Sequence, residues 1–118
     1  MAIKKLQNAY YVTEDMDRAV SFYRDTLGLA LKFQDGARWA QFDAGGTNFS
    51  LSAPEEAAQG AQGAVVIFEV DDLDTVQGRL AERGASVLDT RDMGAHGRSL
   101  TFRDPDGNLV QLFQRAAG

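Results

Sequence analysis

The stretch that decides the fold is Asn8-Ala-Tyr-Tyr-Val-Thr-Glu-Asp15-Met-Asp17, because the chain contains a second version of it. It aligns without a gap with Val65-Val-Ile-Phe-Glu-Val-Asp-Asp72-Leu-Asp74. In both copies an apolar, strand-like run ends at an Asp whose side chain can cap a following helix. An internal repeat of this kind indicates two similar structural units in one chain.

Each copy continues with a helical pattern and three strand-like runs. The helices are expected to begin after Asp15 and Asp72 and to end at Gly28 and Gly84, since glycine readily adopts the left-handed backbone past a last turn. The strand-like runs cover residues 29–34, 38–43 and 48–52, then 85–90, 98–103 and 109–114. Both halves therefore read β-α-β-β-β, with a first module at about 1–53, a polar linker at about 54–63 and a second module at about 64–118.

Composition narrows the classes of partner. With 118 residues the chain is long enough for one domain with a core and too short for two independent ones. The absence of cysteine excludes disulfides and thiolate ligands, and a net charge of -5 gives no basic surface for nucleic acid or anionic membrane. No apolar run approaches the ~20 residues of a membrane helix, and the N-terminal residues lack the apolar stretch of a signal peptide. We expect a single cytoplasmic domain that binds a small molecule or another protein.

Two motifs carry a resemblance to a known family. They are Asp15-Met-Asp-Arg-Ala-Val-Ser-Phe-Tyr23-Arg-Asp-Thr-Leu-Gly-Leu29 and Phe102-Arg-Asp-Pro-Asp-Gly-Asn-Leu-Val-Gln-Leu112. In this order, within the repeat, they resemble signatures of the vicinal oxygen chelate superfamily of glyoxalases, ring-cleaving dioxygenases and bleomycin-resistance proteins. The resemblance covers nearly the whole chain. It implies an α+β fold in which two βαβββ modules form a cupped mixed sheet.

The same resemblance implies four metal-ligand positions, on the first and last strand of each half, which usually hold His, Gln or Glu. In this chain those positions are occupied by Asn8, Ser50, Val65 and Gln111. None of these side chains is anionic, and that of Val65 has no donor atom for a metal. Divalent cations prefer carboxylate oxygen or imidazole nitrogen. We therefore expect neither a tightly held catalytic metal nor another cofactor.

Side chains alternate along a strand, so the four positions define an inner face of the sheet. That face is aromatic and polar but mostly uncharged, which suits a planar aromatic ligand. Trp39 fits a ligand-stacking position and a core or dimer-interface position equally well, whereas Phe42 and Phe102 are expected to pack against the helices. The candidate ligand-binding residues are Asn8, Tyr10, Trp39, Gln41, Ser50, Ile67, His96, Arg98, Thr101 and Gln111.

Two residues are candidates for acid–base chemistry. Glu69 is the one carboxylate expected on the inner face and is a general base if its surroundings raise its pKa; a solvated strand end is the alternative. His96, the only histidine, lies on the glycine-bearing loop Gly94-Ala-His-Gly97, where it either shuttles a proton or forms the rim of a site.

Two functions follow from these expectations. The first is a metal-independent protein of the bleomycin-resistance type, a homodimer that sequesters a planar aromatic natural product and is not an enzyme. The resemblance implies the dimer, and the acidic surface favours a cationic ligand through long-range attraction. The alternative is an enzyme of the same superfamily, a glyoxalase-like lyase, an isomerase or a dioxygenase, with a degenerate metal site, or a metal-free catalyst that relies on Glu69 or His96. A regulatory or purely structural module is a third function, which no feature of the sequence favours.

Overall fold

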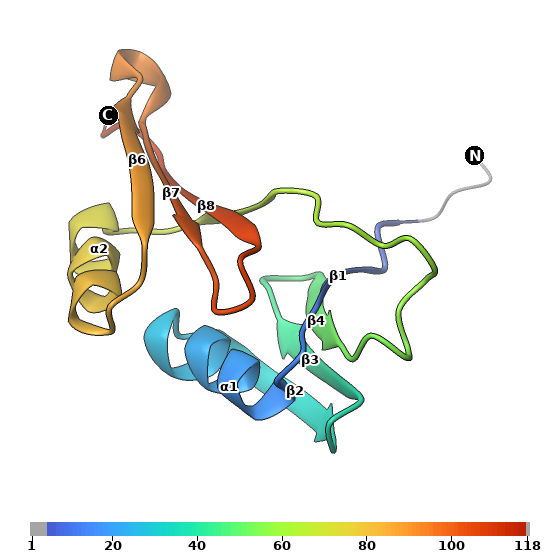
Figure 1. The fold of residues 1–118 in the computed structure, drawn as a ribbon. Coiled ribbons are helices and arrows are strands. Elements are labelled where there is room, and N and C mark those ends of the chain that lie inside the picture. The colour runs from blue at the N-terminus through green and yellow to red at the C-terminus, as the bar shows by residue number, and fades with distance from the viewer. Residues whose placement is uncertain (1–4, 118) are drawn as a thin grey trace. The chain divides into compact units, whose positions relative to one another are not determined.

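The computed structural model describes residues 5–117 and divides the chain into two compact units, between Gln62 and Gly63 (Figure 1). Each unit contains one four-stranded sheet. The elements of the first unit are β1 (Asn8–Val12), α1 (Met16–Ser21), the π-helical turn η1 (Phe22–Thr26), β2 (Ala30–Asp35), β3 (Trp39–Asp43) and β4 (Asn48–Ser52). Those of the second are β5 (Val66–Glu69), α2 (Leu73–Glu82), β6 (Val87–Asp92), the 3-10 turn η2 (Gly94–His96), β7 (Arg98–Arg103) and β8 (Leu109–Gln114).

Both sheets have the same topology, which confirms the expected α+β fold built from two βαβββ modules. The strand orders are β1-β4-β3-β2 and β5-β8-β7-β6. In each sheet the first strand runs parallel to the last one, and the remaining pairs are antiparallel. Parallel neighbours cannot be joined by a tight turn and need a long connection. In each unit this connection contains the helix and the two middle strands.

In the first unit, the helix packs on one face of the sheet through aromatic side chains. Tyr23 lies with its ring centroid 4.8 Å from that of Phe49 and 6.1 Å from that of Phe42. Tyr11 meets Phe49 edge to face, so it points toward the helix as the alternation predicts. Burial of each such side chain contributes roughly 1.5–3 kcal/mol.

The helix of the first unit differs from the expectation of one continuous α-helix. The α-helical part ends at Ser21, and the chain continues in a π-helical turn in which the Leu27 amide bonds the Phe22 carbonyl. This wider turn rotates the end of the helix, so that Thr26 is buried and Leu27 is only partly so. A spacing of apolar residues does not distinguish a π turn from an α turn.

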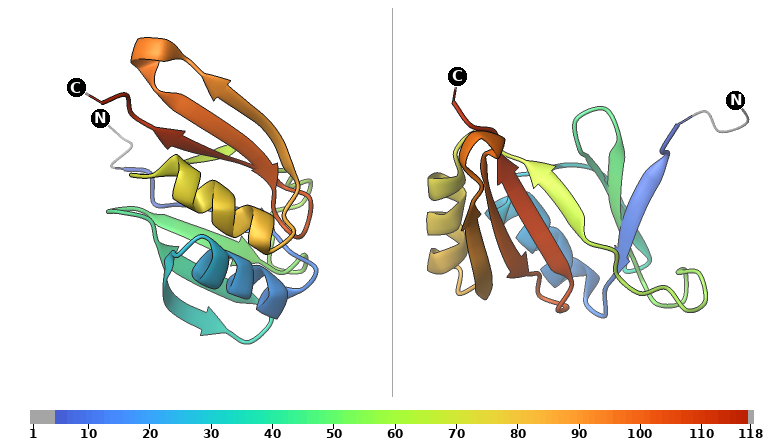
Figure 2. Two further views of the ribbon diagram at one scale, coloured as in Figure 1. Left: turned by 90° about the vertical axis from the view of Figure 1, so that its left-hand side faces the viewer. Right: turned by 90° about the horizontal axis from the view of Figure 1, so that it is seen from above.

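The second unit packs in the same way (Figure 2). Its helix α2 contacts β7 and β8, and Phe102 is fully buried, as expected for the counterpart of Phe42. The remaining buried core of this unit consists of Leu73, Leu80, Leu100, Val110 and Leu112. No helix among residues 5–117 is long and apolar enough to cross a membrane.

The helix boundaries follow from the predicted caps. The Asp15 and Asp72 side chains accept hydrogen bonds from the amides of Arg18 and Thr75. Gly28 and Gly84 have φ angles of 80° and 73°. The second strand of each module starts later than expected, at Ala30 and Val87, because the chain needs residues past the glycine to turn back into the sheet.

Each sheet contains one β-bulge, at aligned positions of the repeat. In β2 the pairing with β3 shifts between Leu31 and Phe33, and in β6 the pairing with β7 shifts between Val87 and Asp89. A bulge adds a residue to one strand, so the alternation of side chains changes there. The sequence alternation alone did not predict either bulge.

The loop between β6 and β7 is held by a close approach of the backbone. Gly97 has a φ of 98°, and a Cβ atom built on it would lie 2.3 Å from the Gln114 carbonyl oxygen. The Met93 amide also bonds the Gly97 carbonyl at 2.8 Å. Gly97 is therefore required for the loop that carries His96.

We predict that Gly97→Ala lowers the free energy of unfolding by about 2–5 kcal/mol, through the strained backbone together with the clash against β8. The matched control is Gly94→Ala, because Gly94 has a φ of 61° and a Cβ atom added to it would meet nothing within 4 Å. This control should cost only about 1–2 kcal/mol. Urea unfolding measures both, and equal losses would contradict the close approach at Gly97.

The cap of α2 predicts a dependence of stability on pH. The Thr75 hydroxyl donates to the Asp72 carboxylate at 2.8 Å and the Thr75 amide at 3.3 Å. Both bonds lower the pKa of Asp72 below its ordinary value of 3.8, and the bond from the hydroxyl has the larger effect. A carboxylate whose pKa is lower in the folded state stabilises the fold above its unfolded pKa, and this contribution is lost as the pH falls through the folded pKa.

We therefore predict that Asp72→Asn lowers the melting temperature slightly at pH 7, and that the difference shrinks as the pH falls below 3.8. Asp71→Asn removes the same charge from the neighbouring exposed residue and should change the melting temperature much less. Thermal unfolding followed by circular dichroism from about pH 7 down to the acid limit of the folded state provides the measurement. A difference that stays constant over this range would contradict the assigned role of Asp72.

Candidate functional site

The candidate site of the first unit lies on the sheet face turned away from α1, which we call the distal face. Strand register places Tyr10, Ser50, Gln41 and Phe33 in one row across β1, β4, β3 and β2. The next row contains Val12, Ser52, Trp39 and Asp35, and the row on the other side begins with Asn8, Asn48 and Asp43. The structure thus brings together five of the predicted ligand-binding residues, namely Asn8, Tyr10, Trp39, Gln41 and Ser50.

Two rings meet over the small side chains of β4. The Tyr10 and Trp39 ring centroids are 5.4 Å apart with an interplanar angle of 58°. Their strands lie on opposite sides of β4, so their backbones are separated by two strand spacings, about 9.5 Å. The rings therefore lean toward each other across β4, and Ser50 and Ser52 below them are fully buried.

Neutral hydrogen bonds connect the polar side chains of this face. Ser50 Oγ donates to Asn8 Oδ1 at 2.9 Å, and Asn8 Nδ2 donates to Gln41 Oε1 at 3.4 Å. Trp39 Nε1 also donates to Gln41 Oε1, at 3.4 Å. The side chains of Asn8, Gln41 and Trp39 are only partly buried, so they retain surface for a ligand.

Phe33 is an additional aromatic residue of the distal face that the sequence reasoning missed. It lies directly opposite Gln41, and 48% of its surface is exposed. Strict alternation from Leu29 and Leu31 assigns Phe33 to the helix face, and the bulge in β2 moves it to the distal face. No signal in the sequence marks this shift.

The linker segment contacts the same end of the first unit. The Ala58 amide donates to the Tyr10 hydroxyl at 2.9 Å, and Ala53 is buried. The Tyr10 ring is therefore fixed both by Trp39 and by the chain that follows β4.

Beside Trp39, the Asp35 carboxylate raises the pKa of Arg38 through a hydrogen bond of 2.6 Å.

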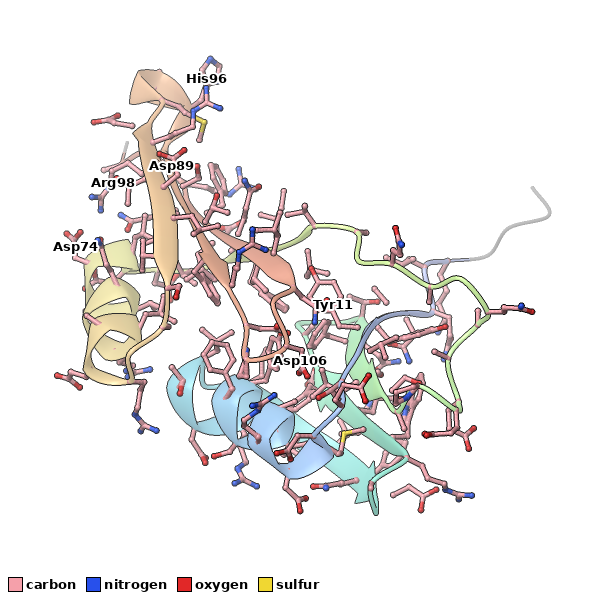
Figure 3. All side chains as sticks on the ribbon, in the orientation of Figure 1. Tyr11, Asp74, Asp89, His96, Arg98 and Asp106 are labelled. Carbon is pink, nitrogen blue, oxygen red and sulfur yellow. The ribbon has the colours of Figure 1, made fainter. Side chains whose placement is uncertain are left out.

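The distal face of the second unit combines neutral side chains with a carboxylate. Ile67 lies opposite Gln111, and Gln111 Nε2 donates to Thr101 Oγ1 at 3.0 Å. The bulge in β6 places Asp89 opposite Thr101, and Asp89 is exposed. Figure 3 shows this side chain on β6. Three predicted residues, Ile67, Thr101 and Gln111, thus share one face.

The expectation that Glu69 is the one carboxylate of the inner face is wrong. Asp89 in the second unit and Asp35 and Asp43 in the first lie on distal faces by register. The two bulges shift the alternation of side chains in β2 and β6, and this shift brings Asp35 and Asp89 to the distal faces.

The two acid–base candidates are both exposed. The Glu69 carboxylate accepts from Arg115 Nε at 3.1 Å, with side-chain exposures of 54% and 75%. His96 lies on the exposed turn η2, at the tip of the hairpin β6–β7 (Figure 3). Both side chains are therefore solvated, and neither lies in a water-excluded site.

Arg98 does not share the face of Thr101 and Gln111. Its guanidinium donates to Asp74 on α2 at 3.2 Å and to Gln114 Oε1 at 3.3 Å (Figure 3). Gln114 Oε1 in turn accepts from the Leu73 amide at 2.7 Å. Arg98 therefore fixes the start of α2 to the sheet, which follows from its alternation with Ser99 and Thr101.

The donor set at the implied metal positions does not fit a divalent cation. The oxygen of Asn8 already accepts from Ser50, the Gln111 amide is bonded to Thr101, and Val65 lies before β5 and is 47% exposed. Among residues 5–117, no three His, Cys, Asp or Glu side chains gather into a group suited to a metal ion. Neutral amides and hydroxyls bind such ions weakly.

Comparison with known proteins identifies the family. Residues 5–112 match the family model described as the Glyoxalase/Bleomycin resistance protein/Dioxygenase superfamily. Metallothiol transferase FosB from Shouchella clausii is 30% identical over 117 residues, which cover 93% of this chain and 80% of that protein.

Solved structures include close matches to the fold. The antibiotic binding protein TnmS3 from Streptomyces sp. CB03234 has a TM-score of 0.72 and 32% identity, covering 98% of this chain and 99% of that one. A superfamily member from Sphaerobacter thermophilus has a TM-score of 0.79 and 26% identity, covering 98% and 100%. The chain belongs to the Glyoxalase/Bleomycin resistance protein/Dioxygenase superfamily.

Proposed function

We propose that this protein binds and sequesters a planar aromatic small molecule without a metal. The observation that carries the proposal is the pair of rings, Tyr10 and Trp39, which lean over the buried serines of β4 at a centroid distance of 5.4 Å. Such a surface stacks on flat apolar ligands. Asn8 and Gln41 beside the rings supply the few polar contacts that orient a ligand.

Electrostatics support binding rather than metal catalysis. The predicted ligand positions are neutral, and their polar atoms are already bonded to one another or to Thr101. Glu69 and His96, the two acid–base candidates of the second unit, are both exposed. A ligand held by stacking and hydrogen bonds would leave the protein chemically unchanged.

The relatives support both of the functions considered. Similarity to the antibiotic binding protein TnmS3 at 32% identity favours a role in antibiotic sequestration of the bleomycin-resistance type. Similarity to Metallothiol transferase FosB at 30% identity favours the alternative, a metalloenzyme of the superfamily. The neutral donor set supports sequestration, because neutral amides and hydroxyls bind a divalent cation weakly.

The test uses 2-naphthylacetamide as a neutral planar aromatic ligand and calorimetry as the readout. We predict that the native chain binds it and that Trp39→Ala weakens binding by about tenfold, since an aromatic stacking surface is lost. Leu6→Ala is the control, because Leu6 is 70% exposed and precedes β1. Circular dichroism establishes that both variants are folded. Equal affinities of the two variants would contradict the role of Trp39.

A metal assay separates the two functions. We predict less than stoichiometric zinc, iron, nickel or manganese in the purified protein, and 2-naphthylacetamide binding that is unaffected by a chelator. One metal ion per chain, whose removal abolishes binding or turnover, would overturn the proposal and favour the metalloenzyme.

We further propose that the protein acts as a homodimer, as the family resemblance implies. The expected mass by light scattering at micromolar concentration is twice the 12.8 kDa of one chain. A strictly monomeric species would contradict this assembly.

A further inference from the structure

We infer that the aromatic ligand proposed above carries an anionic group, a carboxylate or a sulfonate, and that Lys32 binds it. The inference rests on the proposed function and adds the chemical class of the ligand. The observation that carries it is the hydrogen bond from Lys32 Nζ to Asn48 Oδ1, 3.0 Å long, which extends from β2 across β3 to β4.

The position of Lys32 follows from the bulge in β2. The register passes from Leu31, which faces Phe42, to Phe33, which faces Gln41, and leaves Lys32 as the extra residue. Leu31 thus keeps its place toward the helix while Phe33 joins the distal face. The Lys32 ammonium reaches Asn48, which shares the row of Asn8 on that face.

The ammonium of Lys32 has donors to spare. A lysine carries three N–H donors, and the partner of Lys32 is a neutral amide oxygen. Among residues 5–117, no carboxylate lies within ion-pair distance of Lys32. Lys32 therefore brings a positive charge to the distal face without an ion-pair partner among the described residues.

Two carboxylates share this face by register, and neither forms an ion pair with Lys32. Asp43 accepts from the Gly45 amide at 3.0 Å in the turn before β4, and Asp35 is paired with Arg38. The net charge of -5 opposes an anion at long range. Salt screens that repulsion beyond about 8 Å, so the local lysine dominates for a bound ligand.

The spacing fits an aromatic acid with a short arm. Asn48 lies two residues from Ser50 along β4, which is about 7 Å. Ser50 belongs to the row of Tyr10, Gln41 and Phe33. A ring stacked in that row would therefore place a carboxylate on a one- or two-atom arm beside Lys32.

The experiment compares three naphthalene probes of nearly equal size by calorimetry: 2-naphthylacetate as the anion, 2-naphthylacetamide as the neutral isostere and 2-(2-naphthyl)ethylamine as the cation. We expect the native chain to bind the anion about two- to fivefold more tightly than the amide, the range of a partly exposed ion pair. The preference should decrease as NaCl is raised from about 50 mM to about 500 mM.

Variants assign the preference to one residue. Lys32→Met should bind the anion and the amide equally, and Lys32→Arg should retain the preference for the anion. Arg79→Met is the matched control, because it removes one positive charge from the exposed surface of α2 in the other unit and should leave the preference unchanged.

The outcomes separate this inference from the proposed function. If the native chain binds all three probes equally, or the amine most tightly, the inference is overturned and the proposed function stands. If the preference for the anion survives in Lys32→Met, Lys32 is not its source and the inference is likewise overturned. If the native chain binds none of the probes at millimolar concentration, both fail together.

Discussion

The alternation of side chains along β4 is the constraint on which the rest of the first unit depends. Phe49 and Leu51 point to the helix and are buried against Tyr23 and its neighbours. Ser50 and Ser52, which alternate with them, point to the other face. Because β4 is flanked on both sides, by β1 and β3, one strand builds both the core and the floor beneath the ring pair.

Small side chains on that floor determine what the flanking strands can do. A larger residue in place of Ser50 would fill the space into which Tyr10 and Trp39 lean, since side chains of adjacent strands compete for the same volume. The rings are thus held in place from below by serines, from the side by each other and, for Tyr10, by the Ala58 amide. Because the rings are already fixed, stacking a ligand on them would cost little side-chain entropy.

The two modules share a topology and differ in chemistry. The distal face of the first presents aromatic rings, neutral amides and hydroxyls, together with Lys32, Asp35 and Asp43. The aligned face of the second presents Asp89, Ile67 and the Gln111–Thr101 pair. The bulges occur at the same place in both, so the backbone is preserved while the residue it exposes changes from Phe33 to Asp89. Fold and function are therefore specified by different positions of the repeat.

The sequence alone determined the architecture, because caps and alternation are local. Asp15 and Asp72, followed by Gly28 and Gly84, marked both helices, and period-two patterns placed every strand to within about two residues. The same alternation correctly grouped Asn8, Tyr10 and Ser50 on one face.

Only the tertiary structure decided the details that depend on how strands pair. The bulges, which brought Phe33 and Asp89 to the distal faces, arise from a register shift between two strands and leave no mark in the alternation of either. The bond from Lys32 to Asn48 and the ion pair from Arg98 to Asp74 join residues far apart in the chain. Such partners are fixed by packing in three dimensions, which a one-dimensional pattern does not contain.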